Sequence, residues 1–240
     1  MVWRMLQYEG KRSLPLVAAW AAGAVVPAVF ARLRIFSLTD MPLFYLMLFS
    51  SIGLMLYRYY ASMHGPEAAF LFTIDLSPGK QMFVRYFSAG CRSIVTALMI
   101  GLALSIQGEE LGSTLRNLSL PMRMLLLGET AFSAFALFLT ISAPLTISNI
   151  RPFSKHPVLW FLIIGAVMMG ANRLLPKITE RLLPVWLVIT GEGNVLVSTV
   201  PNMAGSLSFS FNVLLWNVVL AAVVMFGVPA VIRKKLLIAR

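Results

Sequence analysis

The stretch from Phe209 to Ile232 reads FSFNVLLWNVVLAAVVMFGVPAVI and contains no Asp, Glu, Lys or Arg. A helix of about 20 mostly apolar residues can cross a bilayer, so this stretch predicts a membrane span. The whole chain agrees, because 59% of its 240 residues are hydrophobic, 12% are charged and the mean hydropathy is +0.83. A soluble domain has about 25% charged residues. The composition therefore excludes a soluble enzyme and a disordered chain, and indicates that lipid is the main solvent.

Five further apolar runs predict five more spans. The six spans lie at about 14–32, 41–60, 84–106, 122–149, 157–175 and 209–232. Residues 1–12 have apolar residues at helical spacing and predict a short amphipathic helix at the membrane interface, with a frayed polar tail as the alternative. The apolar segment 176–208 is interrupted by Pro184, Gly191 and Pro201, so we expect a broken or re-entrant outer segment. The predicted fold class is an all-α polytopic membrane protein, with one transmembrane domain over the whole chain.

The distribution of basic residues predicts the orientation of the chain. Lys and Arg concentrate on the cytoplasmic side of membrane proteins. With six spans and a cytoplasmic N-terminus, 13 of the 20 Lys and Arg residues and three of the nine acidic residues fall in inner segments. We therefore expect a multi-pass protein of the cell membrane with both termini in the cytoplasm. The net charge of +11 then reflects membrane topology, and we expect no nucleic-acid partner.

The segment between the second and third predicted spans, 61–82, is too polar to cross the membrane. Pro66 and Glu67 suit the first turn of a helix, where Pro lacks an N–H that has no partner anyway and Glu faces the positive end of the helix dipole. A Ser-Pro-Gly break at 77–79 ends that helix, and the next one begins near Lys80. We expect a short helix parallel to the membrane on the cytoplasmic side. Its exposed Phe residues suit a groove in a partner protein.

Five residues of this loop match a known pattern: Glu67, Phe72, Thr73, Ser77 and Gln81. The loop resembles that of the permease subunits of bacterial type-2 ABC exporters, which commonly reads like EGYLTFTLPVS followed by a Gln-Leu-Leu segment. The resemblance extends to the six-span layout, the short N-terminal amphipathic helix and the broken outer segment before the last span.

The loop departs from the pattern of that family at Ala68 and Ala69, where Gly-Tyr is usual, and at Asp75, where Pro is usual. The resemblance implies that the loop is a coupling helix seated in a cleft of a separate ATP-binding subunit, present in two copies. It also implies a second permease chain, identical or different. The implied interface with the ATPase consists of Glu67, Phe70, Phe72, Thr73, Asp75, Ser77, Lys80 and Gln81. The alternative is a surface loop whose Phe residues dip into lipid.

The chain carries no sequence motif for chemistry of its own. It has no G-x-x-x-x-G-K-[ST], and the stretch from Ser77 to Lys80 lacks both the first glycine and the hydroxyl residue of that motif. It has no H-E-x-x-H, and we expect no metal site, no bound cofactor and no enzymatic activity. ATP and Mg are expected on the partner subunit. The predicted function is export of a peptide, drug or other amphiphilic compound; the alternative is an ATP-independent secondary carrier or a non-transporting scaffold or enzyme.

Polar residues inside predicted spans are candidates for a substrate path, because such residues are costly in lipid. Glu129 can reach outward to the interface, pair with Arg123, or line a path for substrate. Asn212 and Asn217 in the last span can form hydrogen bonds between helices. Arg92 is expected to reach the headgroups of the inner leaflet.

Overall fold

The computed structural model describes residues 2–33, 40–64, 77–107, 117–150, 153–189, 195–199 and 207–232. The long helices are α1 (Val2–Arg32), α2 (Asp40–His64), α4 (Pro78–Gln107), α6 (Leu120–Ser148), α7 (Pro157–Leu182) and α8 (Phe211–Ala222). A 3-10 helix, η1 (Phe153–Lys155), precedes α7, and a π-helical turn, η2 (Val223–Gly227), continues α8 towards Ile232. The strands β1 (Trp186–Ile189), β2 (Val195–Ser198) and β3 (Leu207–Ser210) lie between α7 and α8 in the sequence.

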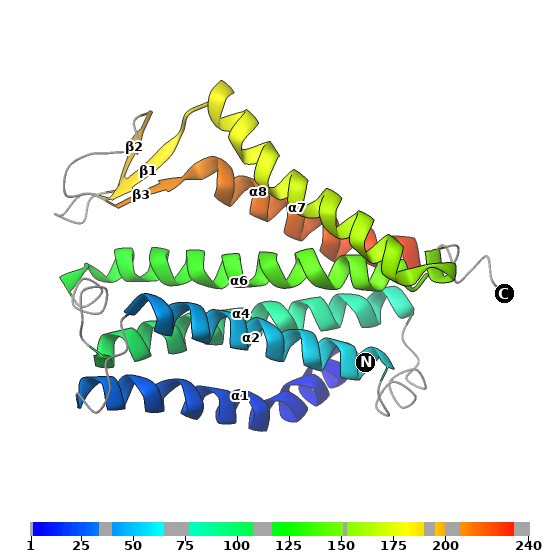
Figure 1. Cartoon of the computed structure of the whole chain (residues 1–240), viewed down its shortest axis with the longest axis horizontal. Helices are drawn as coiled ribbons and strands as arrows, with labels where there is room; N and C mark the ends of the chain where they lie inside the picture. Colours follow the sequence, from blue (N-terminus) through cyan, green and yellow to red (C-terminus); the bar gives the residue numbers. More distant parts are fainter. Residues whose placement is uncertain are drawn as a thin grey trace.

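The long helices run through the molecule in alternating directions (Figure 1). One end of the bundle, which we call the N-terminal end, contains the first residues of α1, α4 and α7. It also contains the last residues of α2, α6 and η2. The three strands lie at the opposite end, which we call the sheet end. α4 packs against α1, α2 and α6, whereas α7 packs against α6 and α8. The helices that flank residues 65–76 therefore lie near the centre of the bundle.

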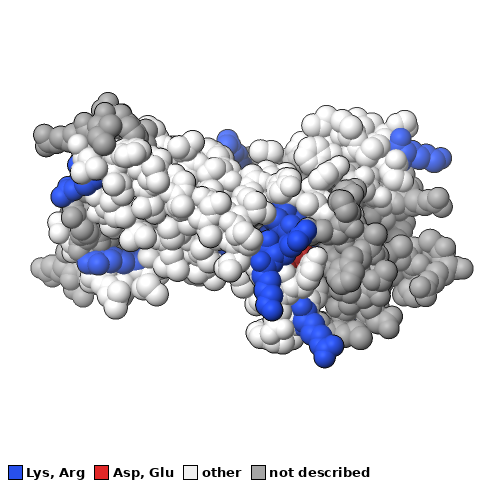
Figure 2. All heavy atoms as spheres, turned by 90° about the horizontal axis from the view of Figure 1, so that it is seen from below, with Lys and Arg blue, Asp and Glu red and all other residues white. Residues whose placement is uncertain are grey.

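Within the described part of the chain, five helices are long and apolar enough to cross a membrane: Val2–Arg32, Pro78–Gln107, Met122–Ser148, Pro157–Leu182 and Phe211–Ile232. α2 lies at the place of the second predicted span, 41–60, and has 25 residues. On the face shown in Figure 2, a broad uncharged surface separates regions where Lys and Arg atoms gather. The coarse prediction of a mostly helical membrane protein is confirmed.

Two helices extend beyond the predicted spans. α4 begins at Pro78, before the span predicted at 84–106 and close to the helix start predicted near Lys80, and α7 continues to Leu182, past the predicted end of its span at 175. Pro at the first helical position costs no hydrogen bond, because the N–H of that position has no partner within the helix. The N–H of Gln81 then donates to the carbonyl of Ser77 at 3.1 Å. The charged residues that bounded the apolar runs thus lie inside longer helices.

The predicted interfacial helix and the first span form one continuous helix, α1, which includes Pro15 and Pro27. Figure 1 shows α1 bent towards its N-terminal end. Pro15 has no N–H to donate to the carbonyl four residues earlier, which favours a bend there. The buried residues of this first part are Met5, Glu9 and Ser13, spaced by four, so one helix face points into the bundle.

The outer segment predicted at 176–208 contains strands, which the all-α prediction did not include. β1 pairs with both neighbours in antiparallel register, with Trp186 opposite Ser198 of β2 and opposite Ser210 of β3. β1 and β2 are rich in Val and Ile, which favour strands. Prolines and glycines in this segment correctly indicated that no continuous helix crosses here. The described part of this segment beyond α7 forms strands, which the sequence analysis did not predict.

Among the described residues, two large clusters of buried apolar residues and a small one around Met5 and Val84 lie in the bundle. At the N-terminal end, the ring of Tyr59 stacks on Tyr86 with centroids 5.9 Å apart and meets Phe138 edge-on at 5.8 Å. Both tyrosine hydroxyls form hydrogen bonds with Thr146. Towards the sheet end, small residues such as Ala103 allow the helices to approach closely. By contrast, no residue in the apolar window of α7 is buried, so this helix lies at the periphery.

Candidate functional site

Most of the predicted coupling loop lies outside the described residues. This applies to Glu67, Phe70, Phe72, Thr73 and Asp75. The remaining three interface residues lie at the start of α4. Ser77 and Lys80 are exposed, whereas Gln81 is 2% exposed and faces the bundle. The structure thus describes the base of the loop at α2 and α4.

The start of α4 packs tightly against the last helix. A Cβ added at Gly79 would lie 2.9 Å from the carbonyl oxygen of Pro229, a distance that real Cβ atoms essentially never show. Glycine is therefore required at this position by the approach of the two backbones. Sequence reasoning treated Gly79 only as part of a Ser-Pro-Gly break and missed this contact.

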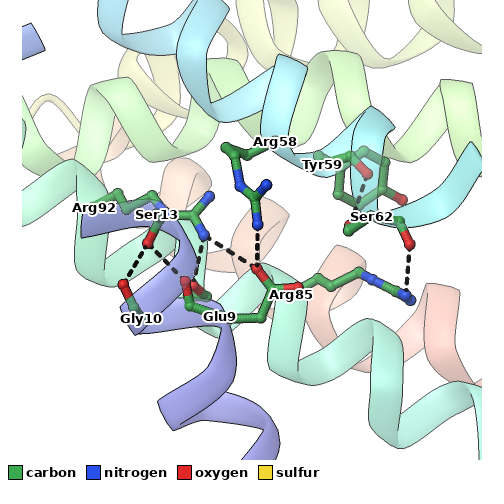
Figure 3. A network of polar contacts seen from close by, with 9 residues as sticks. Glu9, Gly10, Ser13, Arg58, Tyr59, Ser62, Arg85 and Arg92 are labelled. Atoms are coloured by element: carbon green, nitrogen blue, oxygen red, sulfur yellow. Dashed lines mark hydrogen bonds and ion pairs between the residues drawn. The ribbon is translucent and has the colours of Figure 1, made fainter. Parts of the chain in front are cut away.

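A buried cluster of charged residues joins three helices at the N-terminal end (Figure 3). Glu9 Oε2 on α1 lies 3.6 Å from Arg58 Nη2 on α2 and 3.4 Å from Arg92 Nη2 on α4. Arg85, also on α4, donates from Nη2 to the carbonyl of Ser62 at 3.0 Å. We call Glu9, Arg58, Arg85 and Arg92 the arginine cluster. It combines one carboxylate with three guanidinium groups.

The spacing of these residues explains how they meet. Arg85 and Arg92 are seven residues apart, which is about two helical turns, so they share a face of α4. Glu9 lies four residues after Met5 on the buried face of α1, and both residues are below 3% exposed. Arg92 also donates to the hydroxyl of Ser88 at 3.1 Å. Arg92 therefore binds inside the bundle, and the expectation that it reaches lipid headgroups is wrong.

The arginine cluster has little room for a ligand. The cavity that it lines with Tyr59 and Ser62 has a volume of about 10 Å³. A single water molecule needs about 10–15 Å³. Glu9 Oε1 and the Nε atoms of Arg85 and Arg92 form no hydrogen bond with described residues, and one water there could serve them. The contacts of the arginine cluster thus join α1, α2 and α4.

A second polar site lies at the sheet end, in a cavity of about 200 Å³ that is partly open to the surface. The described residues that line it come from α6, α8, β1 and β3. They are Leu125, Glu129, Phe132, Ser133, Leu187, Ser208, Ser210, Val213, Leu214 and Asn217. We call this space the Glu129 cavity.

Regular spacing brings these side chains to one place. The α6 residues at 125, 129 and 132 follow the i, i+4, i+7 pattern of a single helix face. Val213 and Asn217 are four residues apart on α8, and the two serines of β3 are two residues apart, hence on the same side of the strand. The small sheet, which sequence reasoning missed, thus supplies one wall of the cavity.

The polar groups of the Glu129 cavity are poorly satisfied by the protein. Among the described residues, no hydrogen bond or ion pair involves the Glu129 carboxylate or the Asn217 amide, and Asn217 is 8% exposed. The Ser210 hydroxyl oxygen is buried and has no partner either. No Lys or Arg is among the described residues that line the cavity. One carboxylate therefore faces a mostly apolar space without a compensating charge from those residues.

Two of the four predicted intramembrane polar residues meet in this cavity, and two do not. Glu129 and Asn217 both line it. Asn212 instead donates to the carbonyl of Leu183 at 2.8 Å and so ties α8 to the end of α7. Arg123 donates from Nε to the carbonyl of Leu118 at 2.8 Å, and no ion pair joins it to Glu129 within the described part of the chain.

Neither site has the ligands of a metal centre. Within the described ranges, no group of three or more His, Cys, Asp or Glu residues could hold a metal ion. Comparison of the chain with protein-family models, with curated proteins and with solved structures finds no match. The function is therefore argued from these two sites and from the arrangement of the helices.

Proposed function

We propose that the chain is the membrane-spanning permease subunit of an ATP-driven ABC transporter that exports a peptide, drug or other amphiphilic compound. In this proposal ATP and Mg bind to a separate subunit, present in two copies, that docks on the loop at 64–81. A second permease chain completes the transporter. The proposal rests on the loop motif described above and on the way in which the base of that loop is built.

The observation that carries the proposal is the rigid connection at the base of the loop. Arg85, near the start of α4, binds the carbonyl of Ser62, two residues before the end of α2. The stacked rings of Tyr59 and Tyr86 join the same two helices one turn deeper. Glu9 extends the connection to α1. A force applied to residues 65–76 would therefore move three helices together, as coupling to an ATPase requires.

The helix arrangement also supports the proposed topology. α1 begins and the last helix ends at the same end of the bundle, where α2 also ends and α4 also begins (Figure 1). With six crossings, this end is cytoplasmic by the excess of Lys and Arg in the inner segments. The proposed location is the cell membrane, with both termini in the cytoplasm.

The test is co-purification followed by an ATPase measurement. We expect a Walker-motif subunit to co-purify with the detergent-solubilised chain, and its ATPase activity to be stimulated by the chain in vesicles. Glu67→Lys, or deletion of 66–74, should abolish the stimulation while leaving the chain inserted. Glu180→Lys on α7 is the matched control, because it makes the same charge change away from the loop.

Two outcomes would reject the proposal. A chain that purifies alone and transports normally after deletion of 66–74 is an ATP-independent carrier. A chain that neither recruits an ATPase nor transports any amphiphile is a scaffold or a membrane enzyme.

A further inference from the structure

We infer that the Glu129 cavity binds the positively charged head of a small amphiphile, an organic ammonium group attached to an apolar chain. The role of this cavity as the substrate site of an exporter rests on the proposed function. Binding itself is a property of this chain alone and can be measured without an ATPase.

The charge of the ligand follows from the surroundings of Glu129. The residue lies nine positions into α6, about 14 Å along the helix at 1.5 Å per residue, and within the apolar stretch that is predicted to span the membrane. An ionisable group inside a span normally pairs with an opposite charge or lines a pathway. No described residue supplies that charge in the cavity. A cationic ligand would supply it, whereas an anion would be repelled.

The other polar groups of the cavity also lack partners. Asn217 is more than nine-tenths buried, lines the cavity and forms no hydrogen bond with described residues. Ser210 has a buried hydroxyl oxygen without a partner. Unsatisfied buried polar groups are costly, and several of them facing one space point to a ligand or ordered water there. Oxygen acceptors of this kind suit the N–H or N–CH3 groups of an ammonium ion.

The apolar wall and the size of the cavity define the rest of the ligand. Phe132 lies one turn from Glu129 on the same helix face and offers an aromatic surface, which attracts ammonium ions. Leu125, Val213 and Leu214 complete an apolar lining suited to methylene groups. The volume of about 200 Å³ is smaller than the roughly 300–1,000 Å³ of sites for whole drug-sized molecules. The cavity therefore suits a head group and its first carbons, with the remaining chain outside.

The probe is hexyltrimethylammonium, and the controls are hexanesulfonate and hexanol, which share the chain but differ in charge. The full-length chain in lipid nanodiscs, without an ATPase, is titrated with each radiolabelled compound. We expect saturable binding of hexyltrimethylammonium only. Glu129→Gln should weaken it at least about tenfold, whereas Glu180→Gln, which removes a carboxylate from α7 outside the cavity, should leave it unchanged.

A second variant distinguishes loss of the charge from misfolding. Glu129→Asp keeps the charge and should bind hexyltrimethylammonium almost as well as the wild type, whereas Glu129→Gln should not. Both variants are compared as monodisperse samples. Equal binding of hexanesulfonate or hexanol, or unchanged binding in Glu129→Gln, would overturn the inference. Ammonium binding by a chain that recruits no ATPase in the co-purification test would support this inference and count against the proposed function, whereas ATPase coupling without ammonium binding would do the reverse.

Discussion

Glu9 and Glu129 are both carboxylates inside a helix bundle, yet their surroundings differ in every respect. Glu9 is 2% exposed and lies within 3.6 Å of two arginines, in a space of about 10 Å³. Glu129 is half-buried, has no ion-pair partner among the described residues, and faces a cavity of about 200 Å³. The surroundings of Glu9 are thus filled and electrically compensated, whereas Glu129 faces an open space without a compensating charge from the described residues.

The different surroundings of Glu9 and Glu129 indicate different roles, one in stability and one in ligand binding. A buried ion pair with little free space contributes to the position of the helices that it joins, because removal of either partner leaves a costly charge behind. A carboxylate without a partner in a cavity contributes little to the fold and remains available to a ligand. We therefore expect substitutions of Glu9 to change stability and substitutions of Glu129 to change binding.

The largest expected effect is on stability at Glu9. Glu9→Gln removes the charge that compensates Arg58 and Arg92, and should lower the free energy of unfolding by about 3–5 kcal/mol. Denaturant unfolding in mixed micelles measures this change. Glu129→Gln in the same assay should be neutral or slightly stabilising, because it removes a half-buried charge that has no partner in the described residues. Equal decreases in the free energy of unfolding in the two variants would contradict the expected difference between Glu9 and Glu129.

The second prediction concerns the coupling between Glu9 and Arg92. A double-mutant cycle with Glu9→Gln and Arg92→Gln should show an interaction energy of about 1–3 kcal/mol, since the two groups are 3.4 Å apart and largely buried. The control cycle pairs Glu129→Gln with Arg123→Gln, which form no ion pair with each other. Coupling in the control as strong as in the first cycle would contradict the structure.

The third prediction compares the packing of the two ends. Gly79→Ala should cost about 1–3 kcal/mol, because its Cβ would lie 2.9 Å from the carbonyl oxygen of Pro229. Gly128→Ala, next to Glu129, meets no atom within 4 Å and should be neutral or stabilising by up to about 1 kcal/mol, since Ala favours helix over Gly. Thermal unfolding of both variants in the same detergent measures the contrast. Similar midpoints would show that Gly79 is not packed more tightly than Gly128.

The smallest expected effects concern single hydroxyl groups. Thr146→Val removes the hydrogen-bond partner of Tyr59 and should cost about 1 kcal/mol. Ser210→Ala removes a hydroxyl with no partner in the described structure and should change the free energy of unfolding by less than about 0.5 kcal/mol. A larger loss of unfolding free energy for Ser210→Ala would mean that the Ser210 hydroxyl has a hydrogen-bond partner in the Glu129 cavity.

The helices were predictable from sequence, because runs of apolar residues identify spans without knowledge of their neighbours. The boundaries were less predictable, since charged residues such as Arg181 follow the apolar run predicted at 157–175 although α7 continues to Leu182. The sheet was missed because segments of four residues are too short for a clear period, and prolines there suit several structures. The loop motif between Glu67 and Gln81 remains a prediction.

The two sites were also only partly predictable from the sequence. Glu129 and Asn217 were candidates because polar residues inside apolar runs are conspicuous, but their meeting in one cavity depends on the contact between α6 and α8. The arginine cluster was missed because Glu9, Arg58 and Arg92 are far apart in the sequence, and nothing in it shows which helices are neighbours. The seven-residue spacing of Arg85 and Arg92 was the one available signal.

The central claim is that Glu9 stabilises the fold and that Glu129 binds a ligand. The most direct test is the thermal unfolding midpoint of Glu9→Gln and Glu129→Gln in nanodiscs, with and without hexyltrimethylammonium. A ligand that binds only the native state raises the midpoint. We predict that Glu9→Gln unfolds at a lower temperature but is still stabilised by the probe, whereas Glu129→Gln unfolds at the wild-type temperature and is not. The reverse pattern, or the same response in both variants, would contradict the account.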